Sequence, residues 1–386
     1  MKIQRKILPT AFRSHNALFK HQTGKSSLLF IAIAAIAIVI GVISQQSFNT
    51  PAKMPKFEKL LIMPTPKSLG EVSLIDHNGA PFTQQNLKDN WTILFFAFTN
   101  CPDICPNTLL TLKQVKQDLV TANAWSPFQL AMVSVDPERD TPERLKQYVP
   151  FFDPDFIGLT GELDYITKFA KNLGVLFFKK EILADGNYDV DHSAGLILVN
   201  PEGEFAGFMG VPHDRETLSA DLSKLGKHIL STQKSSTLDQ PEKAVNDSAS
   251  ESAKLEHDSN SKQDIEFINA WIRPAPPSAV SMAGYLTIRN NRKTPLNITS
   301  VESTLFNMSM IHETVIEDGV ASMNHLDGLK VASGESVTLA PMGIHMMLMG
   351  PKEPLPMGSK VPVTLMLDTG ESVELTIEVR NDPSNG

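Results

Sequence analysis

Hydrophobic and polar positions change their pattern several times along the chain, and these changes divide it into segments. Residues 28–43 read LLFIAIAAIAIVIGVI, an uncharged run that approaches the thickness of a bilayer once its flanking serines are counted. From about residue 70, apolar runs such as TILFFAF (92–98) and QLAMVSV (129–135) alternate with stretches of helical periodicity, which is typical of an α/β fold. From residue 264 onward, strand-like runs separated by turn residues predict a small all-β sandwich or barrel.

Local signals predict individual elements of the α/β region. EVSLI is a short strand that ends in a turn at 77–79. Thr141 and Pro142 suit the N-cap and the first position of a helix. The sequence Pro-Glu-Gly at 201–203 predicts a hairpin between two strands, and a final amphipathic helix covers about 214–230.

Two segments lack the apolar pattern of a folded domain. Residues 45–66 contain four prolines and are interpreted as a tether. Residues 231–263 lack aromatic residues and are rich in serine and mixed charge, so they predict a disordered, flexible linker. The predicted order is a basic leader (1–27), a transmembrane anchor (28–44), the tether (45–66), an α/β domain (67–230), the linker (231–263) and a β domain (264–380).

The distribution of charge predicts how the chain is oriented. Residues 1–27 carry six lysines and arginines and no acid, within a chain of net charge −8. Such a leader stays in the cytoplasm, so both domains are expected in the periplasm, anchored to the inner membrane. A cleaved signal peptide is the alternative, but SQQSFNTPAK offers no small-x-small cleavage pattern. The acidic remainder argues against a nucleic-acid partner.

The chain has only two cysteines, Cys101 and Cys105, which stand in FFAFTNCPDICPNTL between a predicted strand and a predicted helix. A structural disulfide across so short a loop would contribute only about 2 kcal/mol. Positions i and i+4 on a helix face the same way, and a helix N-terminus favours thiolates, so we interpret the pair as reactive. Two soft thiolates suit copper(I) or zinc, with His192 as the strongest third ligand; His77 and His213 carry weaker signals.

Four motifs in order resemble the Sco/SenC family: FTNCPDICP, SVDPERDTPERLKQYV, FIGLTGE and VDHSAGLILVNPEGEF, over about 60–230. Members of that family are membrane-anchored, thioredoxin-like copper proteins that help assemble the dinuclear copper site of cytochrome c oxidase. The resemblance implies a thioredoxin-like domain in which Cys101, Cys105 and His192 bind copper(I) and copper(II). Asp136 and Asp140 match a loop of the family for which we infer a structural role.

Histidine and methionine recur in the last third of the chain, which holds ten of the 15 methionines. Methionine is usually core filler, and we expect this of Met342, Met346 and Met366. His345 and Met347 lie two apart, so on a strand both project from one face.

One predicted turn decides which of these side chains become neighbours. If Asp318-Gly319 is a two-residue hairpin turn, Met323 is the diagonal same-face neighbour of His312. The same register places His325 opposite His312 and makes it an alternative ligand, and Met349 is a similar candidate. Imidazole and thioether groups without a carboxylate select copper(I) over hard cations.

The spacing His312-x10-Met323-x21-His345-x-Met347 resembles the signature of the periplasmic PCuAC copper-chaperone family, and NAWIRPAPPSAVSMAGYLTIRN resembles its opening strands. This resemblance covers about 265–380. It implies a cupredoxin-like β-sandwich in which the four residues bind copper(I).

Three functions compete for these two sites. A copper metallochaperone uses both, and its partner would be the copper-site subunit of cytochrome c oxidase. A thiol–disulfide oxidoreductase would use Cys101 and Cys105 to reduce target cysteines but needs neither His192 nor the second domain. A passive copper buffer or sensor would not need a membrane anchor. We therefore favour a metallochaperone, which is not an enzyme, with reductase activity as a companion role of the cysteines.

Overall fold

The computed structural model describes residues 54–182, 187–234, 264–277 and 279–383, all within one compact unit that begins at Met54. The predicted leader, the predicted anchor and nearly all of the predicted linker lie outside these residues. Among the residues described, no helix combines the length and apolar character needed to cross a membrane.

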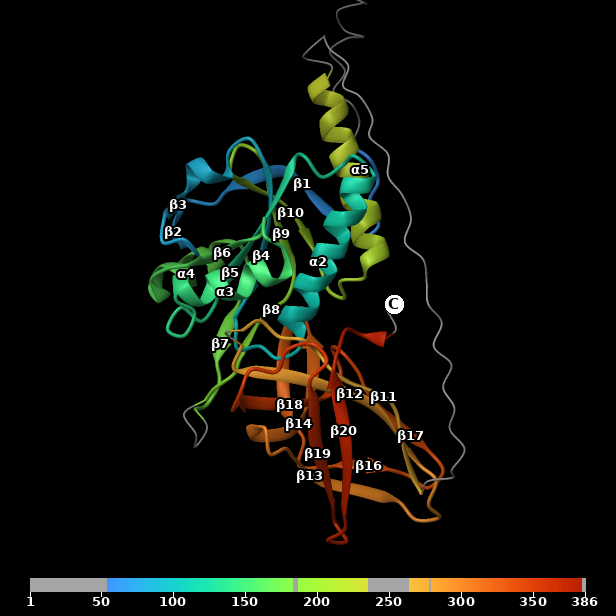
Figure 1. Ribbon diagram of the computed structural model, residues 1–386. Helices are drawn as coiled ribbons and strands as arrows, with labels where there is room; N and C mark the ends of the chain where they lie inside the picture. The colour runs from blue at the N-terminus through green and yellow to red at the C-terminus, as the bar shows by residue number, and fades with distance from the viewer. Residues whose placement is uncertain (1–53, 183–186, 235–263, 278, 384–386) are drawn as a thin grey trace, which may run out of the picture. The chain divides into compact units, whose positions relative to one another are not determined.

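The first domain is built on a mixed sheet with the strand order β1-β10-β9-β4-β5-β6-β2-β3 (Figure 1). The two predicted apolar strands form β4 and β5, which pair in parallel and are almost entirely buried. Such burial on both faces explains why their sequences are continuous apolar runs. The strands are β1 (Leu61–Ser68), β2 (Ser73–Asp76), β3 (Pro81–Thr83), β4 (Trp91–Ala97), β5 (Phe128–Ser134), β6 (Ile157–Thr160), β9 (Leu196–Val199) and β10 (Glu204–Met209).

Helices cover this sheet, and α2 packs beside α5 (Figure 1). Arg215 and Ser219 of α5 both bond to the Asp118 carboxylate of α2, which fixes the pair side by side. Thr141 caps α3 through the amide of Arg144, as predicted. The remaining elements are η1 (Gln84–Leu87), α2 (Ile104–Thr121), α3 (Pro142–Phe152), α4 (Leu163–Asn172), β7 (Phe177–Lys179), β8 (Val190–Ser193) and α5 (Arg215–Lys234).

Strand β1 differs from the sequence interpretation, which placed residues 45–66 in a tether. Leu61–Ser68 pairs with β10 at one edge of the sheet, with a register shift between Ile62 and Lys67. Pro64 and Pro66 fall inside that shift. Proline cannot donate to a ladder and is therefore confined to edge strands and bulges, so prolines that suggest a tether are compatible with an edge strand. At the C-terminal boundary of this domain in the sequence, α5 runs to Lys234, four residues into the predicted linker.

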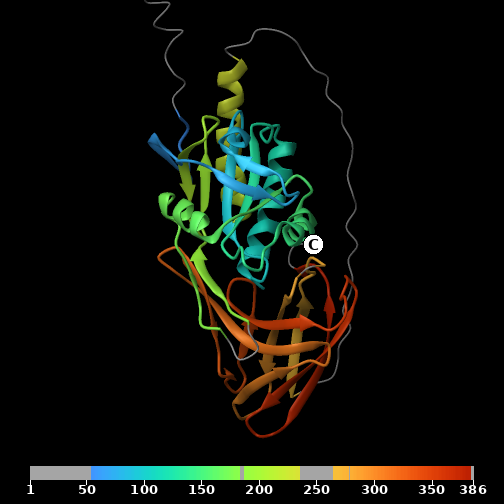
Figure 2. The same cartoon turned by 90° about the vertical axis from the view of Figure 1, so that its left-hand side faces the viewer.

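The second domain consists of strands, and Figure 2 shows no helix in it over the residues described after position 263. Its apolar core includes Ile311, Met346 and Leu348. The predicted turn is present, because Glu317 pairs with Val320 across Asp318-Gly319, both at positive φ. The strands are β11 (Ile265–Ile272), β12 (Ser281–Asn290), β13 (Leu296–Glu302), β14 (Phe306–Glu317), β15 (Val320–His325), β16 (Leu329–Val331), β17 (Ser336–Leu339), β18 (Ile344–Pro351), β19 (Lys360–Leu367) and β20 (Ser372–Val379).

One sheet continues from the second domain into the first. Strand β15 pairs with β8, with Ala321 opposite His192 and Val320 opposite Ser193. Strand β8 in turn pairs with β7, so the order along this part of the sheet is β18-β14-β15-β8-β7. This strand pairing between the domains was not predicted from the sequence.

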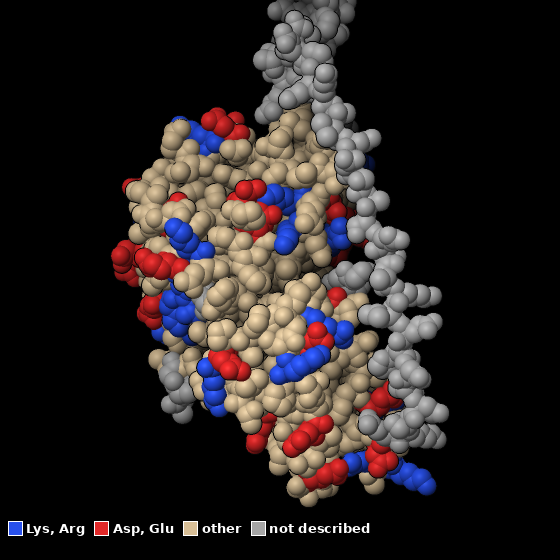
Figure 3. All heavy atoms as spheres, in the orientation of Figure 1, with Lys and Arg blue, Asp and Glu red and all other residues tan. Residues whose placement is uncertain are grey.

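Charged side chains of both signs are interspersed on the face shown in Figure 3. Several charged side chains of the molecule pair, for example Lys179 with Glu138 and Arg292 with Glu371. Exposed pairs of this kind contribute little to stability, at most about 1 kcal/mol each.

Candidate metal centre

Cys101 and Cys105 lie at the start of α2, but only Cys105 is on the helix. Helix α2 begins at Ile104 with Asp103 at the N-cap position, so Cys101 stands in the preceding turn. The expectation that both cysteines occupy i and i+4 positions of one helix is therefore wrong. The predicted helix-end environment is nevertheless present, because the Cys105 amide donates to Cys101 Sγ at 3.4 Å. Both residues are free thiols, and both are buried.

His192 reaches the cysteines from β8. Its Nε2 lies 3.5 Å from Cys105 Sγ, and its Nδ1 lies 3.1 Å from the carbonyl oxygen of Ser193. A carbonyl can only accept, so this contact places a ring proton on Nδ1 and leaves Nε2 facing the sulfur. Phe98 packs edge-on against the ring at 5.9 Å and holds it in place.

The pKa values of the two thiols are shifted in opposite directions. Burial alone would raise the pKa of Cys101, but hydrogen bonds from Cys105 and His192 outweigh it and lower that pKa to about 5. Burial and the neighbouring Cys101 raise the pKa of the Cys105 thiol. One sulfur is thus a ready thiolate at neutral pH, while the other keeps its proton until a ligand displaces it.

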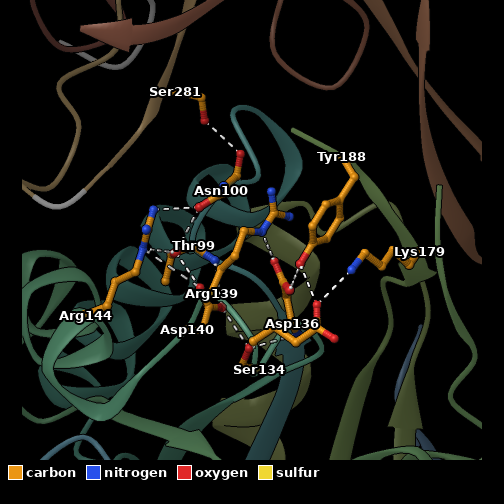
Figure 4. A network of polar contacts seen from close by, with 11 residues as sticks. Thr99, Asn100, Ser134, Asp136, Arg139, Asp140, Arg144, Lys179, Tyr188 and Ser281 are labelled. Atoms are coloured by element: carbon orange, nitrogen blue, oxygen red, sulfur yellow. Dashed lines mark hydrogen bonds and ion pairs between the residues drawn. The ribbon is translucent and has the colours of Figure 1, made fainter. Parts of the chain in front are cut away.

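A polar network holds the residues that precede Cys101 (Figure 4). The buried Asp140 carboxylate accepts hydrogen bonds from the Thr99 hydroxyl at 2.5 Å and from the Ser134 hydroxyl at 2.7 Å. Arg144 donates to Thr99 Oγ1 and, at 2.6 Å, to Asn100 Oδ1. The role inferred for Asp140 is therefore structural, since it fixes the backbone on which Cys101 stands.

Asp136 has a similar place on the other side of this network (Figure 4). Its carboxylate accepts from the Tyr188 hydroxyl at 2.7 Å and from Arg139 Nε at 2.5 Å. The Arg139 guanidinium also stacks on the Tyr188 ring at 3.6 Å. These contacts connect the loop after β5 to the segment that leads into β8 and His192.

The two weaker histidine candidates are used elsewhere. His77 Nδ1 accepts from the Gly158 amide at 2.9 Å, and His213 Nδ1 lies 3.4 Å from Thr108 Oγ1. Burial lowers the pKa of His213 to about 4, so this ring is neutral at physiological pH. Neither ring lies with the cysteine pair in the contacts described, and His213 Nε2 is buried without a hydrogen-bond partner.

In the second domain the predicted register is present. His312 on β14 lies opposite His325 on β15 and opposite His345 on β18, which puts three histidines in one row. Met323 lies opposite Thr314 and is therefore the diagonal neighbour of His312. Residues opposite each other share a face of the sheet, so these side chains all project from one face.

Two of these histidines have buried nitrogen atoms without a hydrogen-bond partner. His345 Nδ1 lies 2.9 Å from the Gly343 carbonyl, which places the proton there, and its Nε2 is buried and unpartnered. His312 Nδ1 is likewise unpartnered. Burial, together with His345 and His325, lowers the pKa of His312 to about 3, so its ring remains neutral as a metal ligand must. Buried orphan nitrogens beside thioethers fit a copper(I) ion.

Met310 is a candidate ligand that the sequence reasoning missed. Its sulfur lies 2.8 Å from His312 Nε2, and it stands opposite Met347 across β14 and β18. Met347 and Met349 are both buried, on the face opposite the core residue Met346. The signal was available, because Met310 precedes His312 by two residues and must share its face on a strand.

The remaining predictions for this region have different outcomes. His325 has an exposed side chain, and its ring centroid lies 5.5 Å from that of His312. Met346 is core filler, as expected. Met342 packs against the core of the first domain from a turn with φ 62°, and its amide donates to Asp103 Oδ2.

The clustering of side chains that bind hard or borderline metals also bears on the two predicted ligand sets. Over the described part of the chain, no three His, Cys, Asp or Glu side chains converge tightly enough to hold a metal ion as they stand. Cys101 Sγ faces the Cys105 amide, while Cys105 Sγ faces His192.

Comparison with known proteins gives two matches along the chain. Residues 64–227 match the SCO1/SenC family, and residues 265–379 match a family described as putative lipoprotein LpqE-like. A putative copper-binding protein of Stutzerimonas stutzeri is 39% identical over 153 residues, which cover 40% of this chain and 74% of that protein. The SCO1 homolog 1 of Arabidopsis thaliana mitochondria is 41% identical over 155 residues, which cover 40% of this chain and 46% of that protein.

A crystal structure of Arabidopsis thaliana ScoI with copper bound is 39% identical, covers 42% of this chain and 98% of its own, and has a TM-score of 0.39. The matched region spans about half of the Arabidopsis SCO1 homolog. The motifs around Cys101, Cys105 and His192 lie inside it. The family match spans residues 64–227, and the match to the 39% identical Stutzerimonas stutzeri protein covers 74% of that protein's length. The chain therefore belongs to the SCO1/SenC family.

Proposed function

We propose that this chain is a copper metallochaperone with two copper sites. In the first domain, Cys101, Cys105 and His192 would hold copper(I) or copper(II). In the second domain, His312, Met323, His345 and Met347 would hold copper(I), with Met310 beside them. Imidazole, thiolate and thioether are the donors that copper prefers among protein groups.

The observation that carries this proposal is the state of the buried donors. His192 Nε2 faces a cysteine sulfur, and His345 Nε2 is buried without a hydrogen-bond partner. An unsatisfied buried polar atom is costly unless a ligand completes it. The copper named for the Stutzerimonas relative and the copper bound in the Arabidopsis structure agree with this assignment.

The family resemblance extends the proposal to a destination. We place the chain in the inner membrane through residues 28–44, with both domains in the periplasm and the second as a cupredoxin-like, PCuAC-type domain. Its copper would go to the dinuclear copper site of cytochrome c oxidase.

Copper(I) stoichiometry of the purified full-length chain tests the function. Against a chromogenic copper(I) chelator, the unmodified chain should bind two equivalents. Cys101→Ser with Cys105→Ser should leave one, and His312→Ala with His345→Ala should leave the other. Met366→Leu, a conservative change of a methionine outside both ligand sets, should still bind two. A single equivalent in the unmodified chain would show that one site does not form.

A thiol–disulfide oxidoreductase is the second candidate, because both thiols are free and one sulfur accepts a helix amide. In that reaction the two thiols become one disulfide while a target disulfide becomes two thiols. His192→Ala separates the two functions. It should leave disulfide exchange with oxidised glutathione intact and reduce copper binding; loss of exchange with full copper binding would favour the reductase.

A further inference from the structure

Asp103, between the two cysteines, is bound mainly by the second domain. It occupies the N-cap position of α2 but makes no capping bond. Its carboxylate instead accepts from Tyr285 OH at 2.8 Å, Thr314 Oγ1 at 2.7 Å and the Met342 amide at 2.8 Å. From its own domain it accepts from Asn107 Nδ2 at 2.8 Å. An aspartate that would ordinarily cap its helix is therefore used to bind another domain.

The backbone of the cysteine loop is bound from the same side. Arg273 Nη1 donates to the Asp103 carbonyl at 3.2 Å, and Nη2 donates to Asn107 Oδ1 at 2.6 Å. Ser281 Oγ donates to the Asn100 carbonyl at 2.7 Å (Figure 4). The side chains of Arg273 and Asp103 are 5% and 0% exposed. Burying a charged pair is favourable only when hydrogen bonds satisfy both partners, as they do here.

The two predicted copper sites meet at this interface. His192 lies opposite Ala321, so Met323, two residues further along β15, is its diagonal neighbour on the same face. Thr314 shares that face, and its hydroxyl holds Asp103. The same Asp103 oxygen lies 3.8 Å from His345 Nδ1. One face of the continuous sheet thus carries ligands of both sites, with the cysteine loop against it.

Both ligand sets are closed to solvent in this arrangement. Cys101 and Cys105 are 3% and 0% exposed, and Met323 belongs to the same apolar cluster as the cysteines. His345 and Met347 are also buried. Another protein's ligands therefore have no access to either copper site while the domains remain docked.

We propose that the second domain is an intramolecular lid over the cysteine site, that Asp103 is the positioning residue that holds it, and that copper(I) passes between the two ligand sets inside this interface. The transfer rests on the proposed function; the lid does not. The step is a ligand exchange: two sulfurs replace imidazole and thioether donors, the remaining thiol proton leaves, and copper stays copper(I). Thiolates bind copper(I) more strongly than thioethers, so the direction is from the second domain to the first.

The lid is tested without copper, by the rate at which a bulky maleimide labels the reduced, metal-free, full-length chain. Tyr285→Phe with Thr314→Val removes two hydroxyl donors to Asp103 and changes neither cysteine nor any proposed ligand. Each hydrogen bond to a charged group shifts the opening equilibrium by about tenfold or more, so labelling should rise by about 100-fold. Thr338→Val, on the exposed strand β17, is the matched control and should label like the unmodified chain.

Several results would overturn the lid. One is labelling of the double variant within about twofold of the unmodified chain. Another is an unmodified chain that labels as fast as the chain unfolded in urea. If the double variant fails to fold, as seen by circular dichroism, Thr314→Val alone should give about a tenfold increase. Copper stoichiometry of the same samples reports separately on the proposed function, since open variants should still bind two equivalents.

Transfer is tested by giving the unmodified chain one equivalent of copper(I). Its arrival at the cysteines, followed by thiolate-to-copper(I) absorption, should have a rate independent of chain concentration. A rate that rises in proportion to concentration would overturn transfer within one chain.

Discussion

Asp221 on α5 offers a sharp test of how the N-terminal edge of the first domain is held. Its carboxylate is fully buried and accepts the backbone amides of Glu58 at 2.9 Å, Lys59 at 2.8 Å and Leu60 at 3.0 Å. These residues lead directly into β1. Asp221→Ala would leave three amides without their acceptor while changing little volume.

The expected cost follows from those three bonds. Hydrogen bonds to a charged group contribute about 1.5–3 kcal/mol each, but the amides are partly solvated once the segment loosens. We therefore expect a loss of roughly 3–4 kcal/mol, close to that for breaking one buried charged interaction. In a domain of this size that lowers Tm by roughly 10 °C. Asp221→Asn keeps one acceptor oxygen and should lose less.

The pH dependence gives the prediction a second readout. Burial alone would raise the pKa of Asp221, but the amides of Glu58, Leu60 and Lys59 outweigh it and lower the pKa. A carboxyl with a lowered pKa stabilises the fold above its unfolded pKa, and this contribution is lost as pH falls through the folded pKa. The unmodified chain should therefore lose stability below about pH 4 by more than Asp221→Ala does.

Thermal and urea unfolding of the full-length chain, followed by circular dichroism from pH 3 to 7, measure both effects. Glu202→Ala, in the turn between β9 and β10, is a control that should unfold like the unmodified chain. A Tm for Asp221→Ala within 2 °C of the unmodified chain at pH 7, or parallel pH profiles, would refute the reasoning.

Further predictions concern the two proposed copper sites. His192→Ala should weaken or shift the sulfur-to-copper(II) charge-transfer band, and an unchanged visible spectrum would remove His192 from the site. Met310→Leu should lower copper(I) affinity at the second site, measured by chelator competition, whereas Met366→Leu should not; equal affinities would leave Met310 a packing residue. Because burial lowers the pKa of His312 to about 3, copper(I) binding in the double cysteine-to-serine variant should persist from pH 7 to 5. A loss of about 30-fold over that range would indicate an ordinary histidine instead.

Much of the fold could be predicted because its signals are local. The buried strands β4 and β5, the Thr141 cap and the Asp318-Gly319 turn each depend on a few adjacent residues. The edge strand β1 was missed because its prolines resemble those of a linker. The pairing of β15 with β8 was missed because it joins residues more than 100 positions apart, and neither strand's pattern shows which partner it takes.

The candidate site shows the same division. The spacing of Cys101 and Cys105 predicted a reactive pair, and the family resemblance added His192 to it as the proposed third ligand. Asp103 was passed over because an aspartate at a helix start already has an ordinary explanation as a cap. Only the contacts from Tyr285 and Thr314 show that its carboxylate is used differently.

The backbone of His192 takes part in the strand pairing that joins the two domains. Its Cα partner across β8 and β15 is Ala321, and its side chain points at Cys105. The proposed metal ligation and the domain closure therefore share one residue, and thermodynamic linkage makes their coupling reciprocal. If domain closure raises the copper affinity of the His192 site by some factor, bound copper raises the equilibrium constant for closure by the same factor. Loss of the ion would then favour separation of the two domains. Copper release and opening of the interface would therefore occur together.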